Sequence, residues 1–180
     1  MSPLPDDLYI RPACVNDLKA ITGIYSHWVR FGTASFELDP PDEAEMRRRH
    51  EVLVDGDHPY LVAEGGGEIL GYAYAGPYRP RPGYRFTVED SIYLEPKAQG
   101  LGVGKRLLTE LIAAATVAGF RQMVGVIGDS SHQASIRLHA AQGFRLVGIF
   151  ENVGWKHGRW LDSVLMQRAL GDGSDEPPSD

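Results

Sequence analysis

The sequence lacks several features that mark particular classes of protein. Cys14 is its only cysteine, which excludes an intrachain disulfide and the cysteine clusters that bind zinc or iron–sulfur groups, so we expect no metal. The longest apolar run, Leu111–Ala118, is too short to cross a bilayer. The N-terminus has no basic segment followed by an apolar stretch, as a secretory signal would. From these absences we expect a cytoplasmic protein with no membrane partner.

An excess of positive charge is also missing. The net charge is -6 at pH 7, which argues against broad electrostatic binding to nucleic acid or to an anionic membrane. A local positive pocket for a phosphate-bearing ligand is compatible with that charge. Hydrophobic residues make up 43% of the 180 positions, which is enough to bury the core of one domain.

The two ends of the chain are expected to be tails. Residues 1–7 contain two prolines and two aspartates, and residues 171–180 are acidic and contain no apolar side chain. Neither segment can bury enough apolar surface to offset the entropy of ordering. We therefore expect a flexible N-terminal tail over 1–7, a single domain over 8–170 and a disordered acidic tail over 171–180.

The apolar periodicity predicts strands mixed with helices. Helices are expected after Asn16 or Asp17 up to Gly32, from Asp42 towards Val54, from Val103 to Gly119, and over Ala134–Ala141. Strands are expected at Leu8–Arg11, Tyr60–Glu64, Glu68–Ala75, Phe86–Leu94, Met123–Ile127, near Phe144–Phe150 and near Trp160–Met166. This order contains hairpin-like connections, so it favours a mixed α/β (α+β) sheet flanked by helices over a purely parallel sheet.

A glycine-rich turn, Gln99–Gly104, joins a predicted strand to an amphipathic helix. Such a turn lets the backbone approach a ligand, and the free N–H groups of the first helical turn suit a phosphate or pyrophosphate. The Walker A spacing fails at Gln99 and at Arg106, and the dinucleotide fingerprint lacks its third glycine. The pattern Q/R-x-x-G-x-G/A fits without exception, with Gln99, Gly102 and Gly104.

That pattern resembles the acetyl-coenzyme A signature of the GNAT acyltransferases. Other segments resemble one branch of them, the phosphinothricin and methionine sulfoximine N-acetyltransferases. The resemblance implies a mostly antiparallel sheet, splayed in the middle, and a homodimer. It implies acetyl transfer from acetyl-CoA to the α-amine of a small amino-acid-like substrate, by direct attack in a ternary complex. The segments that carry it are Phe31–Phe36, Gly71–Tyr78, Tyr84–Tyr93, Leu138–Phe144 and Gly154–Asp162.

The resemblance also implies positions for the site. Glu89 matches the catalytic carboxylate of the family, and His132 stands where the family commonly has Asn, which leaves the role of this cofactor-binding position open. The substrate-contact segment corresponds to Gly83, Tyr84 and Arg85. The backbone of Ile92, Tyr93 and Leu94 is expected to pair with the pantetheine arm. The pyrophosphate is expected on Gln99, Gly100, Leu101, Gly102, Val103 and Gly104.

Chemical reasoning assigns roles to these residues. The α-ammonium group must lose a proton before it attacks a thioester, and Glu89 is the candidate base if burial raises its pKa. His139 is the candidate general acid, although a structural hydrogen bond explains a helical histidine equally well. Arg85 is the candidate for gripping a substrate carboxylate, with Arg79 and Arg81 as alternatives. The Thr33 hydroxyl is expected to line the acceptor pocket.

Two other functions fit the same signature. One is acetylation of a peptide or protein N-terminus, and the other is a CoA-binding module without catalysis, for which Glu89 would have no use. The basic residues beside Trp155 and Trp160 are expected to form a hairpin that packs against the acceptor pocket or a dimer partner. Cys14 is expected to be a small buried residue rather than a nucleophile.

Overall fold

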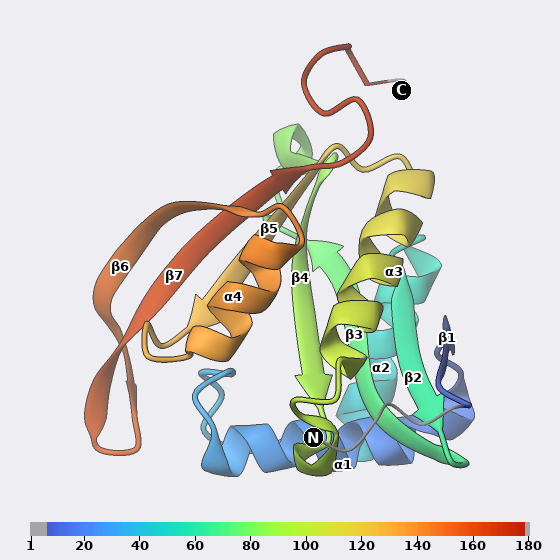
Figure 1. Cartoon of the computed structure of the whole chain (residues 1–180), viewed down its shortest axis with the longest axis vertical. Coiled ribbons are helices and arrows are strands. Elements are labelled where there is room, and N and C mark those ends of the chain that lie inside the picture. The colour runs from blue at the N-terminus through green and yellow to red at the C-terminus, as the bar shows by residue number, and fades with distance from the viewer. Residues whose placement is uncertain (1–6, 179–180) are drawn as a thin grey trace.

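The computed structural model describes residues 7–178, and these form one sheet covered by helices (Figure 1). The strand order is β1-β2-β3-β4-β5-β7-β6, and β4–β5 is the only parallel pair within residues 7–178. The predicted mixed, mostly antiparallel sheet is therefore confirmed. The strands are β1 (Tyr9–Pro12), β2 (Tyr60–Gly65), β3 (Glu68–Pro77), β4 (Thr87–Leu94), β5 (Gln122–Gly128), β6 (Arg145–Lys156) and β7 (Arg159–Ala169). The helices are α1 (Leu18–Phe31), α2 (Glu43–Asp55), α3 (Val103–Val117) and α4 (Gln133–Ala141).

The two faces of the sheet carry separate apolar clusters. One cluster packs α3 against the sheet and includes Val88 of β4. The other packs α1 and α2 against the opposite face and includes Tyr93 of β4. Because side chains alternate along a strand, Glu89 and Ser91 share the α1–α2 face with Tyr93, whereas Asp90 shares the α3–α4 face with Val88.

Local sequence signals explain where the helices begin. The Asp42 side chain caps α2 by accepting from the Glu45 N–H at 2.8 Å. Gly102 is the N-cap residue just before α3, and its φ of 87° places it in the left-handed region that a side chain disfavours. Gly32 ends α1, as its position in the sequence predicts.

The strands β4 and β5 pair over only part of their length. Their register runs from Thr87 opposite Gln122 to Asp90 opposite Gly125. Beyond that point β4 stays with β3 while β5 stays with β7, so the two strands separate (Figure 1). The sheet is therefore open between the last residues of β4 and β5.

Two parts of the chain differ from the sequence-based expectations. The β6–β7 hairpin extends to a two-residue turn at His157 and Gly158, which both have positive φ, as tight hairpin turns require. Cys14 is exposed, so the prediction that it is buried is wrong. It lies just before a short 3₁₀ turn, where its N–H donates to Asp17 at 2.8 Å.

The structure describes only part of the two expected tails. Residues 1–6 and 179–180 fall outside it, while Asp7 accepts a hydrogen bond from the Gly66 N–H at 2.9 Å. Residues 171–178 form turns and bends, and Asp172 pairs with Arg121 at 3.1 Å. Among the helices described, none is long and apolar enough to span a membrane.

Candidate active site

The opening in the sheet borders a large cavity. This cavity, which we call the cofactor cavity, has a volume of about 640 Å³ and lies between the end of β4, the start of α3 and the start of α4. Leu101 and Val103 do not line it; their side chains pack into the core. The predicted cofactor residues that line it are Ile92, Tyr93, Leu94, Gln99, Gly100, Gly102, Gly104 and His132.

The backbone of β4 presents alternate residues to the opening. The bonds from Tyr78 N–H to the Thr87 carbonyl and from Glu95 N–H to the Leu70 carbonyl show that odd-numbered residues of β4 face β3. The N–H and C=O groups of Ile92 and Leu94 therefore face the opening, whereas those of Tyr93 face β3. The Leu94 carbonyl accepts from the Trp28 indole N–H at 2.7 Å.

The start of α3 provides donors for an anion at the other end of the cofactor cavity. Helix α3 has no side-chain cap, so the first N–H groups of a 15-residue helix lack intrahelical acceptors. Lys105 and Arg137 line the same cavity and add two positive charges. Free strand amides at one end and cationic and amide donors at the other fit the pantetheine and pyrophosphate of acetyl-CoA. Arg137 and Trp28 were not predicted, because nothing in their local sequence distinguishes them from other helical residues.

Glu89 lies half-buried on β4, one residue before the point where β4 and β5 separate. Burial, and then the charge of the adjacent Asp90, raise its pKa to about 7, against an opposing effect of Arg79. A carboxylate with that pKa can accept a proton near neutral pH.

His139 forms a buried pair with Asp90 on the other face of β4. Its Nε2 lies 2.9 Å from the Asp90 carboxylate and its Nδ1 lies 2.8 Å from the Ser135 carbonyl oxygen. Both neighbouring oxygens can accept a hydrogen bond, so this geometry lets both ring nitrogens donate, as they do in an imidazolium. Burial opposes that charge, but the hydrogen bond and charge of Asp90 outweigh it and raise the pKa of His139. Gly125 makes room for the pair, since a Cβ there would lie 3.0 Å from the imidazole.

His132 is the N-cap residue just before α4, and it lines both the cofactor cavity and a smaller cavity of about 50 Å³ in the opening itself. His139 and the separated ends of β4 and β5 line this smaller cavity too. Burial lowers the pKa of His132, although the charge of Asp129 opposes the effect. A neutral imidazole therefore faces both cavities, where it can donate or accept one hydrogen bond at each nitrogen.

The predicted substrate-contact residues lie apart from these cavities. Gly83 and Tyr84 lie in an exposed 3₁₀ turn between β3 and β4, and the exposed Arg85 has its guanidinium 4.5 Å from the Phe86 ring centre. The half-buried Thr33 turns its carbonyl towards Gly128. Arg79, named above as an alternative, is the arginine whose charge acts on Glu89.

Residues 32–42, which join α1 to α2, lie between the cofactor cavity and the α1–α2 face of the sheet, and we call this segment the lip. The Lys156 ammonium group is buried and donates to the Ser35 carbonyl oxygen at 2.6 Å. Phe36 packs against Gly154, where a Cβ would lie only 2.4 Å from its ring. Ala34, in the middle of the lip, lines the cofactor cavity. The β6–β7 hairpin thus contacts the lip through Lys156 and Gly154.

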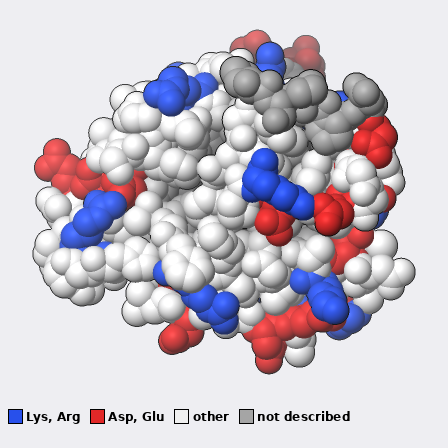
Figure 2. Space-filling view, turned by 60° about the horizontal axis from the view of Figure 1, so that its bottom comes forward, with Lys and Arg blue, Asp and Glu red and all other residues white. Residues whose placement is uncertain are grey.

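The surface around the site is not dominated by one sign of charge. Figure 2 shows basic and acidic side chains interspersed around a hollow whose surface is mostly uncharged. No group of three or more side chains suited to a metal ion occurs within the described residues. Among the described residues that line the cofactor cavity, by contrast, Lys105 and Arg137 carry the only acidic or basic side chains apart from His132, which suits a small phosphate-bearing ligand.

The fold, the open sheet and the glycine-rich start of α3 define an acetyl-CoA-dependent acetyltransferase, and the chain belongs to the Acetyltransferase (GNAT) family, whose sequence profile matches residues 21–144. It is 55% identical to phosphinothricin N-acetyltransferase of Alcaligenes faecalis over 163 residues, which cover 91% of this chain and 83% of that protein. It is 41% identical to an L-methionine sulfoximine/L-methionine sulfone acetyltransferase of Pseudomonas aeruginosa, covering 89% and 94% of the two chains. The crystal structure of a phosphinothricin acetyltransferase from Sinorhizobium meliloti in complex with AcCoA superposes with a TM-score of 0.94 at 48% identity, covering 96% and 94%.

Membership in this family sets aside the alternative of a CoA-binding module without catalysis. The predicted enzyme class and the use of acetyl-CoA are confirmed. The acceptor amine and the roles of individual residues are taken up next.

Proposed function

We propose that the protein acetylates the α-amine of a small amino acid analogue of the phosphinothricin, methionine sulfoximine or methionine sulfone type. The names of the relatives support this substrate class. The observation that carries the proposal is the position of Glu89. A carboxylate with a pKa of about 7 lies where the sheet opens, on the face that the lip and α1 cover.

The proposed mechanism is direct attack within a ternary complex. Acetyl-CoA supplies the acetyl group as a thioester. Glu89 accepts the proton of the α-ammonium group, directly or through one water molecule. The N–H groups of Ile92 and Leu94 face the opening and are the donors available for negative charge that develops there. Cys14, the only cysteine, is exposed before α1 and lines none of the cavities described here, which supports transfer without an acetylated cysteine.

We propose that the Asp90–His139 pair fixes α4 against β4 and so holds the sheet open. Both ring nitrogens of His139 are engaged, so donating a proton would require it to break one of two hydrogen bonds. This arrangement supports a positioning role over the predicted general-acid role. The two roles differ in their pH dependence, since a general acid would add a basic limb to the kcat profile.

We also propose that the protein is a homodimer. Strand β6 is an edge strand, and several of its large apolar side chains are about half exposed, among them Leu146, Ile149, Phe150 and Trp155. Such a row on an edge strand suits burial against a second copy of the chain. Sedimentation equilibrium of the protein and of a Phe150→Asp variant tests this, with dissociation expected in the variant.

The experiment that tests the function is an assay of thiol release from acetyl-CoA with a panel of acceptors. The panel contains phosphinothricin, methionine sulfoximine, methionine sulfone and a peptide with a free N-terminus. We expect saturable turnover of an amino acid analogue, loss of at least about 100-fold in Glu89→Gln, and no loss in the exposed control Glu110→Gln. Turnover of the peptide alone would replace the proposal with N-terminal acetylation, and an active Glu89→Gln variant would exclude Glu89 as the base.

A further inference from the structure

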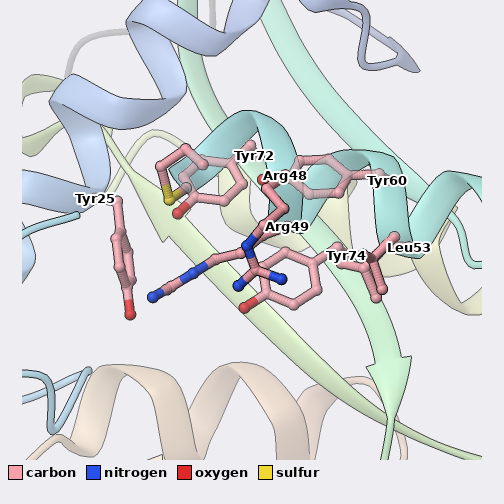
Figure 3. A pocket seen from close by; sticks show the side chains of 9 residues that line it. Tyr25, Arg48, Arg49, Leu53, Tyr60, Tyr72 and Tyr74 are labelled. Atoms are coloured by element: carbon pink, nitrogen blue, oxygen red, sulfur yellow. The ribbon is translucent and has the colours of Figure 1, made fainter. Parts of the chain in front are cut away.

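A second sizeable cavity lies on the α1–α2 face of the sheet, between α2 and the strands β2 and β3 (Figure 3). We call it the aromatic pocket. Its volume is about 290 Å³, which suits a side chain rather than a whole cofactor. It is lined by Tyr25, Met46, Arg48, Arg49, Val52, Leu53, Tyr60, Tyr72 and Tyr74.

Aromatic rings and aliphatic side chains form much of the wall of the aromatic pocket. The rings of Tyr60, Tyr72 and Tyr74 lie nearly parallel, with interplanar angles of 8° to 22°. They stand on adjacent strands, since Tyr60 is paired with Tyr74 in the β2–β3 register. Leu53 of α2 lies beside Tyr74 and also lines the pocket (Figure 3). These surfaces suit a short aliphatic stem.

One hydrogen-bonding group in the wall has no partner. The Tyr72 side chain is fully buried, and its hydroxyl makes no hydrogen bond in the described structure. Burial holds the pKa of Tyr72 well above its ordinary value, so the hydroxyl keeps its proton. An unpaired buried hydroxyl is unfavourable, and in native proteins a buried polar group usually pairs with a protein group or an ordered water, whose place a ligand oxygen can take.

The charged groups at the mouth of the pocket balance one another. Arg49 pairs with Glu37 at 2.6 Å and with Glu45 at 2.7 Å, and Arg48 pairs with Glu45 at 2.8 Å. Figure 3 shows both arginine side chains between Tyr25 and Tyr74. Two cations matched by two anions leave no excess charge for an ionic tip of a ligand, so within the proposed substrate class the mouth favours the uncharged sulfoximine and sulfone tips over an anionic phosphinate.

The pocket begins beside the proposed catalytic base. Tyr74 is opposite Ser91 in the β3–β4 register, and Glu89 lies two residues before Ser91 on the same face. Burial raises the pKa of Tyr74, and the charge of Glu89 adds to that effect. On the other side, the Tyr25 hydroxyl lies 2.9 Å from the Ser35 hydroxyl of the lip. An acceptor whose amine approaches Glu89 therefore has the aromatic pocket next to it.

We propose that the aromatic pocket receives the side chain of the acceptor amino acid, and that the Tyr72 hydroxyl donates a hydrogen bond to an uncharged oxygen at the tip of that side chain. A sulfone or sulfoximine oxygen on a two-carbon stem has this chemistry. Tyr72 is then a specificity-determining residue that favours an oxygen-bearing tip over a hydrocarbon tip. This inference rests on the proposed function, which supplies the amino acid acceptor.

The test compares two acceptors in the full-length protein and in Tyr72→Phe. Methionine sulfone carries the oxygen, and norleucine has a hydrocarbon side chain without it. We expect kcat/KM for methionine sulfone to fall about 10-fold or more in Tyr72→Phe, and that for norleucine to change less than about 2-fold. The melting temperature should not fall, because the substitution removes only an unpaired hydroxyl. Tyr9 is an exposed tyrosine on β1, so Tyr9→Phe is the matched control and should change kcat/KM for neither acceptor.

Two kinetic outcomes would overturn the proposal. An equal fall for both acceptors would show that Tyr72 acts through packing, and no change for either would show that the pocket holds only water. If the wild-type protein acetylates no amino acid, the proposed function fails. Calorimetric titration with methionine sulfone in the presence of CoA then measures whether the aromatic pocket binds this ligand. Binding that weakens about 10-fold in Tyr72→Phe would support the pocket, and absence of such binding would overturn it.

Discussion

Replacing Glu89 with Gln should make the protein more stable at alkaline pH even though it abolishes turnover. Gln has nearly the same shape as Glu but no charge, so the variant isolates the cost of burying the carboxylate. That cost exists because the pKa of Glu89 is raised to about 7, mainly by burial. An acid with a raised pKa in the folded state destabilises the fold wherever it is ionised.

The magnitude follows from the pKa difference. The ordinary pKa of a glutamate is 4.5, and a difference of about 2.5 units corresponds to about 3.4 kcal/mol at full ionisation. Glu89 is only half-buried, so solvent screening reduces this to roughly 2 kcal/mol. Below pH 4.5 the carboxyl is protonated in both states and the cost disappears; above pH 7 it is complete.

Urea unfolding followed by circular dichroism, at pH 5 and at pH 8.5, measures the effect. We expect Glu89→Gln to gain roughly 2 kcal/mol over the wild type at pH 8.5, or about 4–8 °C in melting temperature, and much less at pH 5. The exposed control Glu110→Gln should stay within about 0.5 kcal/mol at both values. A gain that is equal at both pH values, or a loss at pH 8.5, would refute the reasoning that burial sets the pKa of Glu89.

Three further substitutions test other parts of the site. Asp90→Asn should lower the free energy of unfolding by about 3–5 kcal/mol at pH 6, because it leaves the His139 imidazolium buried without its counterion. This loss should shrink at higher pH, because the wild-type ring itself deprotonates as the pH rises through its raised pKa. Urea unfolding at pH 6 and pH 9 measures the difference. Gly128→Ala should lower the free energy of unfolding by about 1–3 kcal/mol, because a Cβ there would lie 2.2 Å from the Thr33 carbonyl oxygen of the lip. The displaced lip should also raise the KM for the acceptor. Thermal unfolding measures the first effect and steady-state kinetics the second. Cys14→Ser should keep full turnover, and initial velocities should give intersecting lines, as direct attack requires.

Each of these predictions has a control or a contrary result. Asp172→Asn removes one partner of an exposed ion pair and should cost less than about 1 kcal/mol. Gly148→Ala introduces a Cβ with no atom within 4 Å and should leave the acceptor KM unchanged. A loss in Asp90→Asn that is the same at pH 6 and pH 9 would contradict the imidazolium assignment. An inactive Cys14→Ser variant would require a covalent route.

The architecture was predictable because it depends on local signals. Apolar periodicity marks α1 and α3, glycines mark their ends, and Gly65–Gly67 mark the β2–β3 hairpin. Glu89 and the glycine-rich start of α3 were found because strand, turn and helix follow one another within a short segment. The length of β6 was underestimated, because Glu151 and Asn152 interrupt its apolar run where the register with β7 shifts, between Phe150 and Gly154.

The aromatic pocket was not predictable, because its groups meet only after the strands pair. Tyr60 and Tyr74 are 14 positions apart and become neighbours through the β2–β3 register. The arginines of α2 gave the pattern of a charged, solvated helix, and their pairing with Glu37 of the lip depends on the packing of α2. The burial of a single residue is equally non-local, and Cys14 was predicted wrongly for that reason.

The lip between α1 and α2 connects the two cavities through adjacent residues. Ala34 borders the cofactor cavity, while the Ser35 hydroxyl contacts Tyr25 of the aromatic pocket. A ligand that binds in one cavity and shifts the lip therefore changes the free energy of ligand binding in the other cavity. Thermodynamic linkage makes such an effect reciprocal: the factor by which acetyl-CoA changes acceptor affinity equals the factor by which the acceptor changes acetyl-CoA affinity. The short lip would then set the cooperativity between the two substrates.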